Sequence, residues 1–300
     1  MNNGTRPEVT FITLSFGRDF ALCRTLCASL DRTMPPGVKH IIYVPPNDLA
    51  IFSQLQSPVR EIRSERQLLP RGVIQLPRPK GKLLGRLKFL RRNMYWTPGA
   101  GLTRGWIMQQ IMKISAACQA ETETVVHVDS DVAIVRNFTL DVFQIGEQRR
   151  LLRIPGAGNT DMHLRWHRTA SALLGLEFVG YQDADYIGNL ICWRRSNVVK
   201  MLAHIEKLHS QEPFRLLAQC KHLSEYILYG IFCDKIMGLE EAGHAVSYVP
   251  HCFDVWSDED LEKWREQPAK IPASQFAVCL QSTLTLDLGQ RTEVLESLIR

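Results

Sequence analysis

Apolar and polar positions alternate with two different periods along the first part of the chain. A run of β-branched and apolar residues at 9–15 is followed by a turn at 16–19 and then by apolar residues at helical spacing. A second apolar run at 40–44 precedes another predicted helix near 48–55. This strand–helix–strand–helix order is typical of a parallel sheet covered by helices, so the pattern predicts an α/β fold.

The rest of the chain continues the mixture of strands and helices without an internal repeat or a linker, so we expect a single domain. An irregular stretch is expected at 155–169. The remaining predicted elements are helices at 104–120, 196–208 and 224–236, strands at 124–128, 190–193, 245–249 and 276–284, a charged helix after 257 and a terminal helix.

Composition agrees with an ordinary globular chain, because 45% of the residues are hydrophobic and 22% are charged. The net charge of +5 is mild and favours anionic ligands without identifying one. No apolar run approaches the roughly 18 residues of a membrane-spanning helix, and the N-terminus lacks the layout of a secretory signal, so we expect a cytoplasmic location. Eight scattered cysteines without a C-x-x-C pair are interpreted as reduced core thiols.

One segment, residues 78–92, is cationic and amphipathic. It contains seven basic residues and no acidic one, interleaved with Leu and Phe. It is either a solvated surface helix or loop, or a site for docking to an anionic polymer or to the inner face of a membrane. Nucleic acid is not expected as a partner, because no recognised nucleic-acid-binding motif accompanies the segment.

The most informative motif is Asp129-Ser130-Asp131, which directly follows the apolar strand predicted at 124–128. A buried strand that ends in two carboxylates places both at a sheet edge, where they can share a divalent cation with a phosphate-bearing ligand. Lys113, on the helix that leads into this strand, is either solvated or a ligand contact. The motif follows a half of the chain that can hold a nucleotide at its strand ends, so we predict an enzyme site for a phosphorylated or nucleotide-activated substrate.

The order of these motifs resembles that of sugar-nucleotide-dependent glycosyltransferases of the GT-A fold, and among them an uncharacterised bacterial group associated with capsule and surface glycans. The resemblance covers roughly residues 9–256. The segments that carry it are 13–19, 104–113, His127 to Asp131, Gly188-Asn189, Ser224-Glu225-Tyr226, Tyr229-Gly230 and His251.

The resemblance implies a Rossmann-like, mostly parallel central sheet flanked by helices. Within the single domain of residues 1–300, it implies a nucleotide-binding half at 9–135, an acceptor and catalytic half at 136–256, and a C-terminal extension at 257–300. It further implies transfer of a sugar from a nucleotide sugar, foremost a UDP-sugar, to a glycan or lipid-linked acceptor in bacterial surface-polysaccharide synthesis.

In such enzymes the acidic motif holds Mn²⁺ or Mg²⁺, which bridges the diphosphate of the donor and neutralises the charge on the leaving nucleotide. The resemblance makes Asp131 the principal metal ligand, and Asp129 a second ligand or a contact to ribose and water. His251 is a third ligand if its strand returns beside the motif. A loop histidine bonded to backbone is the equally weighted alternative.

The family resemblance gives Glu225 a catalytic role, in which it deprotonates or holds the attacking hydroxyl of the acceptor. Glu225 follows Ser224 at a predicted helix start, and a hydroxyl cap followed by an acidic residue explains the pair equally well without catalysis. A helix N-terminus keeps a carboxylate ionised but also lowers its basicity.

Contacts to the donor are implied at two turns. Ser15, Arg18 and Asp19 follow the first strand and are implied to hold the base and ribose, with an ordinary charged turn as the alternative. Gly188 and Asn189 allow the backbone to approach the donor sugar, although an ordinary turn also uses these residue types.

Three aromatic side chains in the expected irregular stretch are candidates for an acceptor groove, because aromatic rings stack on sugar faces. They are His163, Trp166 and His167.

Two other functions remain open. Haloacid-dehalogenase-like Mg²⁺-dependent phosphatases also carry D-x-D after an apolar strand, and Asp129 would then be the nucleophile. In those enzymes the motif normally ends the first strand of the domain, whereas here more than a hundred residues precede it. The third possibility is a catalytically inactive GT-A-like module that binds a glycan or a partner. It stays open because Ser224-Glu225 replaces the Glu-Asp pair that is more usual in the family.

Overall fold

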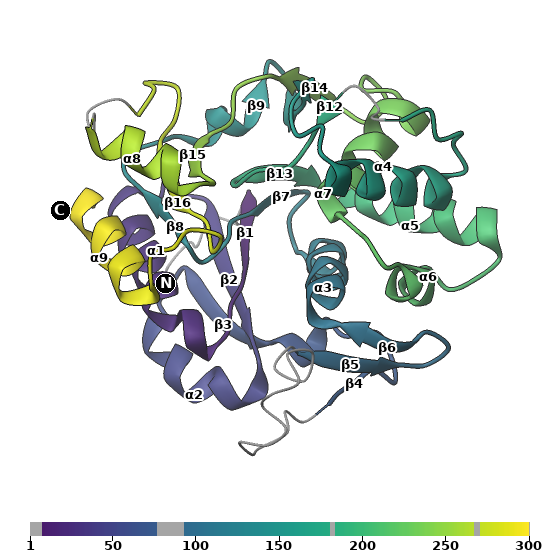
Figure 1. The fold of residues 1–300 in the computed structure, drawn as a ribbon, viewed down its shortest axis with the longest axis horizontal. Helices are drawn as coiled ribbons and strands as arrows, with labels where there is room; N and C mark the ends of the chain where they lie inside the picture. Colours follow the sequence, from purple (N-terminus) through teal and green to yellow (C-terminus); the bar gives the residue numbers. More distant parts are fainter. Residues whose placement is uncertain (1–7, 77–92, 181–183, 267–270, 300) are drawn as a thin grey trace, which may run out of the picture.

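The computed structural model describes residues 8–76, 93–180, 184–266 and 271–299 (Figure 1). Its centre is a five-stranded sheet in the order β13-β7-β1-β2-β3. The strands from β7 to β3 are parallel, and β13 pairs antiparallel with β7. The prediction of a mixed α/β domain with a mostly parallel sheet is confirmed. The five strands are β1 (Val9–Leu14), β2 (Val38–Val44), β3 (Arg60–Ser64), β7 (Thr124–His127) and β13 (Ile191–Arg194).

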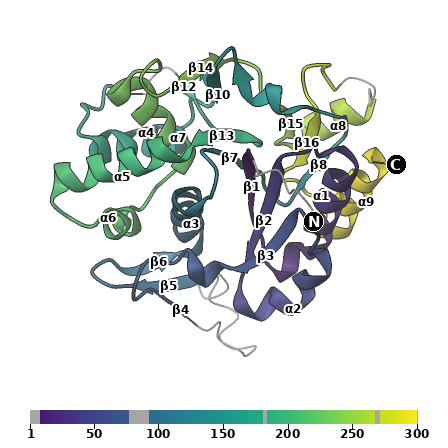
Figure 2. The ribbon, with the colours of Figure 1, turned by 180° about the vertical axis from the view of Figure 1, so that it is seen from behind.

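Helices cover both faces of this sheet, as Figures 1 and 2 show from opposite sides. On β1, Phe11 packs with α1 (Phe20–Thr33), whereas its neighbour Ile12 packs with α3 (Gly105–Gln119). Successive side chains of a strand point to opposite faces, so a strand covered on both faces is apolar throughout. This is why β1 and β7 consist mainly of β-branched and apolar residues and every position in them is buried.

The remaining helices and strands surround this centre. The short α2 (Leu49–Phe52) packs beside α1. The other helices are α4 (Asp161–Leu174), α5 (Arg195–His209), α6 (Pro213–Gln219), α7 (Glu225–Ile231), continued by a π-helix at Phe232–Met237, α8 (Asp258–Glu266) and α9 (Leu288–Leu298). The other strands form smaller sheets. One contains β4 (Ile74–Gln75), β5 (Met94–Thr97) and β6 (Gly101–Arg104), and another contains β9 (Gln144–Ile145), β10 (Gln148–Leu152) and β14 (His244–Ser247). β11 (Ile154–Pro155) pairs with β12 (Ala184–Asp185), and β8 (Val132–Ile134), β15 (Cys252–Val255) and β16 (Ala277–Leu280) form a further sheet.

The expected irregular stretch at 155–169 is wrong in its second half, because α4 begins at Asp161. The Thr160 side chain accepts a hydrogen bond from the His163 N–H at the helix start, and Gly175 ends the helix with a positive φ of 71°. The helix was missed because charged and histidine side chains lie between its apolar positions. Its inner face is formed by His167, Ala170, Ser171, Leu173 and Leu174.

The C-terminal residues pack into the body of the domain. Strand β16 lies between β15, to which it is parallel, and β8, to which it is antiparallel. β8 begins directly after Asp131, and the Leu280 N–H donates to the Asp131 carbonyl at 3.3 Å. Helix α9 packs on α1. The end of the acidic motif is therefore fixed by the last part of the chain.

Two further findings concern the sequence predictions. Six of the eight cysteines are buried, as expected for core thiols. In the described parts of the chain, no helix has the length and apolar character needed to cross a membrane. The cationic segment at 78–92 lies outside the described residues.

Candidate active site at the end of strand β7

The acidic motif lies at the carboxyl end of a central strand. β7 runs between β1 and β13, and the Val128 N–H still donates to the Ile12 carbonyl at 3.0 Å before the chain reaches Asp129. The carboxyl ends of parallel strands form the edge at which open α/β sheets bind ligands. A pocket of about 210 Å³ opens there. Its polar lining includes Gln109, Gln110, Lys113, Asp129, Asn189, Ser224 and Glu225.

A buried lysine holds the carboxylates of this pocket together. The Lys113 ammonium, on α3, lies 3.1 Å from Asp129 Oδ1 and 3.1 Å from Glu225 Oε1, and it donates to the Tyr226 hydroxyl at 3.0 Å. Only 7% of the Lys113 side chain is exposed. Burial opposes the charged form, but Asp129, Tyr226 and Glu225 raise the pKa of Lys113 well above its usual value. Lys113 is therefore a fixed ammonium in contact with two predicted site residues.

Glu225 is the first residue of α7, and the Ser224 side chain accepts a hydrogen bond from the Ile227 N–H at 3.4 Å as the helix cap. The predicted cap is therefore present. Glu225 is 1% exposed, and burial raises its pKa although Lys113 acts in the opposite direction. Burial thus outweighs the acidifying effects that we expected at a helix start.

Asn189 connects the motif to a carboxylate that the sequence analysis did not identify. Its Oδ1 accepts from the Asp129 N–H at 3.3 Å, and its Nδ2 donates to Asp254 Oδ1 at 2.8 Å. The next residue, Leu190, has a positive φ of 59° although it is buried and not glycine. This strained turn aims Asn189 at the motif, so Asn189 positions Asp129 and Asp254 relative to each other.

Asp131 lies deeper than Asp129 and has different neighbours. Its Oδ1 accepts from the Cys279 thiol at 3.5 Å, and its Oδ2 lies 3.9 Å from Arg291 Nη1 on α9. Burial and the neighbouring Asp129 raise the pKa of Asp131 to about 7, and burial raises the pKa of Asp254 to about 6. Three acidic side chains thus gather at one strand end.

The predicted third metal ligand is not brought into this group. No set of three His, Cys, Asp or Glu side chains among the described residues could hold a metal ion, so His251 does not complete such a site with Asp129 and Asp131. The His251 ring instead packs against Phe143 and Phe276, with ring centroids 5.4 and 5.0 Å apart.

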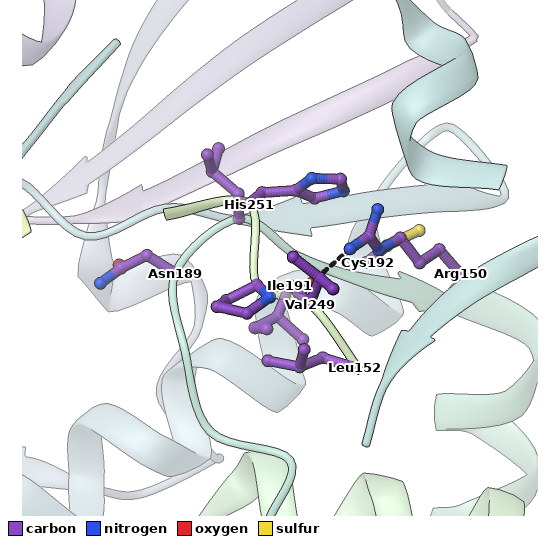
Figure 3. Close-up of a pocket in the computed structure, with 9 residues that line it drawn as sticks. Arg150, Leu152, Asn189, Ile191, Cys192, Val249 and His251 are labelled. Carbon is purple, nitrogen blue, oxygen red and sulfur yellow. Dashed lines mark hydrogen bonds between the residues drawn. The ribbon is translucent and has the colours of Figure 1, made fainter. Parts of the chain in front are cut away.

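The cavity beside His251 is too small for a ligand. Its volume is about 10 Å³, room for about one water molecule, and Arg150 and Cys192 also line it (Figure 3). Burial, and secondarily the charge of Arg150, lowers the pKa of His251 to about 3, so the imidazole is neutral. Asp254, three residues further along the chain, is the side chain of this segment that faces the motif through Asn189.

A larger cavity, of about 730 Å³, continues from the site across the ends of the parallel strands. Ser15 and Arg18 line it, as expected for residues that follow β1, but Asp19 is not among its lining residues. Asp19 is partly buried instead, and its charge neighbours are Arg291 and Arg18. The larger cavity and the 210 Å³ pocket share Trp106, Gln109 and Trp166 as lining residues.

The larger cavity carries positive charge on the side opposite β1. Arg104 and Lys221 line it together with His222. Burial, together with Arg165, Arg104 and Lys221, lowers the pKa of His222, which therefore stays neutral among these cations. The cavity is large enough for a drug-sized ligand, and its charge favours an anionic one.

Of the three aromatic candidates, only Trp166 lines both cavities. It stacks on Trp106 with ring centroids 5.7 Å apart. His163 instead lies at the start of α4, where its Nδ1 is 2.8 Å from Thr160 Oγ1. His167 is fully buried on the inner face of α4, so its predicted place in a groove is wrong.

Several lining residues were not predicted as site residues, and the sequence contains a signal for some of them. Trp106 and Gln109 lie on α3, one turn or more before Lys113, so the spacing from Lys113 could have identified that face. Trp256 and Gln281 follow β15 and β16, and only the pairing of these two strands brings them to the pocket.

Comparison with known proteins places the chain in a family. A search of curated proteins found no match. A family described as "Family of unknown function (DUF6492)" matches residues 12–300, which include every site residue discussed above. The chain therefore belongs to this family of unknown function.

Proposed function

We propose that the protein is a nucleotide-sugar-dependent glycosyltransferase whose reaction centre is the pocket that contains Lys113, Asp129 and Glu225. One observation carries the proposal: a cationic cavity of about 730 Å³ at the ends of the parallel strands leads directly into a 210 Å³ pocket lined by carboxylates, amides and tryptophans. The first suits a nucleoside diphosphate, and the second suits a sugar ring. This arrangement agrees with the GT-A resemblance of the sequence.

Different residues of the cleft contact different parts of the proposed donor. Ser15 and Arg18 contact the nucleotide in the larger cavity, while Trp106 and Trp166 form the wall between the nucleotide and the sugar. Asn189 and Gly188 approach the sugar from the strained turn before β13. Precise placement of the donor reduces the entropy that must be lost in the transition state.

Glu225 is the proposed general base. It lines the sugar pocket, and burial raises its pKa and thus its basicity. Lys113 opposes the effect of burial on the pKa of Glu225 and holds Glu225 beside Asp129. Binding of an acceptor hydroxyl next to Glu225 allows the carboxylate to accept the proton as the hydroxyl attacks the donor sugar.

The acidic residues fit a divalent cation that arrives with the donor diphosphate. Mg²⁺ is usually bound by one or two carboxylates plus substrate phosphates rather than by a complete protein cage, and Asp129 and Asp131 supply such oxygen ligands. Asp254 accepts a hydrogen bond from Asn189 and does not complete a set of three metal ligands with them. When bound, Mg²⁺ or Mn²⁺ would neutralise charge on the leaving nucleoside diphosphate.

The decisive test is a thermal-shift titration of the full chain with UDP, GDP, CDP and dTDP, and then with UDP-sugars, with and without Mn²⁺. A ligand that binds only the native state at a hundred times its Kd stabilises it by about 2.7 kcal/mol. We expect one diphosphate to raise the melting temperature only with the metal, and Asp131→Asn to abolish the shift. Asp141→Asn, an exposed aspartate outside the cleft, is the matched control.

Other outcomes would identify the competing functions. If none of the four diphosphates binds in the presence of Mn²⁺, the transferase proposal is wrong. Release of phosphate from a phosphoester panel with Mg²⁺, lost in Asp129→Asn, would establish a phosphatase instead. Binding of nucleotide sugar without transfer or hydrolysis would indicate an inactive binding module.

A further inference from the structure

An exposed apolar row crosses the small sheet of β4, β5 and β6. Ile74 pairs with Trp96, and Trp96 pairs with Leu102, so the three side chains lie side by side across the strands. Their exposed fractions are 58%, 46% and 67%. Contiguous exposed apolar side chains usually mark a contact with a partner or a membrane.

The opposite face of this sheet is already packed. Tyr95 is buried in the core next to α3, and the Thr103 hydroxyl is 3.5 Å from the Ala218 carbonyl on α6. Figures 1 and 2 place the sheet at the margin of the molecule, beyond α3. The apolar row therefore lies on the face of this sheet that is not packed against α3 and α6.

Charge is segregated onto the stretch that contains this sheet. Residues 66–120 hold eleven Lys and Arg and no Asp or Glu, whereas the rest of the chain holds 25 Lys and Arg and 31 Asp and Glu. Lys113 is buried, but Arg66, Arg71 and Arg104 are exposed, and Arg104 shares the outer face of β6 with Leu102. Seven of the cations lie between β4 and β5, at 78–92, outside the described residues.

We propose that the outer face of the β4-β5-β6 sheet binds an anionic lipid bilayer, with Ile74, Trp96 and Leu102 entering the headgroup region. Interfacial binding requires apolar side chains, preferably including tryptophan, beside Lys and Arg that attract anionic headgroups. A second copy of the chain fits poorly, because two such faces would repel each other. Nucleic acid would use the cations but would gain little from an exposed leucine and isoleucine.

The test is co-sedimentation of the full chain with phosphatidylcholine vesicles, with and without phosphatidylglycerol, in the absence of any nucleotide. We expect binding only to the vesicles that contain phosphatidylglycerol, and weaker binding at higher salt. The double variant Trp96→Ser, Leu102→Ser should bind these vesicles at least about tenfold more weakly than the wild type and keep the wild-type melting temperature. The matched control is Val179→Ser, Tyr248→Ser, which removes two exposed apolar side chains outside the acid-free stretch.

Three results would overturn the proposal. They are equal binding to both kinds of vesicle, wild-type sedimentation of the Trp96→Ser, Leu102→Ser variant, and tight binding to RNA without binding to vesicles. Because no nucleotide is present, each result is independent of whether the protein is a glycosyltransferase.

Discussion

Two of the buried cations, Arg60 at the edge of the central sheet and Lys113 on α3 beside the end of β7, have different surroundings. Arg60 is 2% exposed, and its five N–H groups donate to His40, Asp31, and the carbonyls of Leu55 and Cys27. Every donor is used within the fold, and no cavity described above reaches it. Arg60 thus has the properties of a structural cation.

Lys113 has partners of a different kind. It contacts two carboxylates and a phenol that line a pocket, and one of those carboxylates, Asp129, is 34% exposed. A ligand in the pocket can therefore change what Lys113 contacts, whereas Asp31, the exposed partner of Arg60, lines none of the cavities described above. The comparison shows that burial, pairing and the exposure of one partner do not distinguish a structural ion from a functional one, but a position of the partners in a pocket does.

The largest expected effect is from Lys113→Met. Removal of the ammonium leaves Glu225 buried without its cation, so we expect a loss of about 3–5 kcal/mol in the free energy of unfolding. Denaturant unfolding measures this loss, and Lys113→Met combined with Glu225→Gln should recover part of it. Both variants should lose metal-dependent nucleotide binding. Retained binding in the folded double variant would make Lys113 structural, like Arg60.

Arg60→Met should cost somewhat less, about 3 kcal/mol. The Leu55 and Cys27 carbonyls lose their donors, but Asp31 is half exposed and can be solvated. Denaturant unfolding again provides the measurement, with Arg24→Met, an exposed cation on α1, as the control. Nucleotide affinity of the folded variant should equal that of the wild type. A weakened affinity would contradict the distinction between the two cations.

Glu65 is a buried carboxyl group that forms no ion pair with the described residues. Burial raises the pKa of Glu65 to about 7, and the Tyr95 hydroxyl donates to it at 3.4 Å. The folded state thus binds this proton more tightly than the unfolded state, whose pKa is near 4.5. The contribution of Glu65 to stability is fully present below about pH 4.5 and is lost as the pH rises through about 7.

Glu65→Gln should therefore be more stable than the wild type by about 2 kcal/mol above pH 7, and nearly equal to it below pH 4.5. Thermal unfolding across this range measures the difference. Glu177→Gln, an exposed glutamate, should follow the wild type at every pH. A pH-independent difference for Glu65→Gln would mean that the buried carboxyl is paired after all.

The smallest expected effect concerns the cap that positions Glu225. Ser224→Ala removes the acceptor of the Ile227 N–H and should cost about 0.5–1 kcal/mol, because the 3.4 Å hydrogen bond is long. Denaturant unfolding tests this, and Thr160→Ala at the start of α4 is the matched control for a cap outside the site. A similar stability loss with reduced turnover only in Ser224→Ala would show that this cap also places the proposed base.

Much of the fold could be predicted because its central strands are covered on both faces. β1, β2 and β7 consist mainly of β-branched and apolar residues, which predicts buried strands. β3, with the sequence REIRS, was not predicted, because hydrogen bonds rather than an apolar side chain bury Arg60 at its start. α4 was misread for a similar reason, since polar side chains interrupt its apolar spacing.

The candidate site could be predicted only in part, because it depends on contacts between segments that are distant in the sequence. Lys113, Asp129 and Glu225 could each be identified from local signals, but their meeting at one ammonium depends on how α3, β7 and α7 pack. Asp254 was missed and His251 preferred, because the direction of these side chains depends on the pairing of β15 with β16. Local sequence identifies the chemistry of a residue, whereas distant pairing decides which neighbours it has.

Strand β6 contributes to two surfaces within two residues. Leu102 belongs to the exposed apolar row, and Arg104 lines the larger cavity. Side chains two residues apart on a strand are about 7 Å apart, so a bilayer that received Leu102 would lie next to the entrance of the cleft. A substrate with a lipid tail would then reach the protein by lateral diffusion in the plane of the membrane. Its encounter rate would depend on its density in the membrane rather than on its solubility in water.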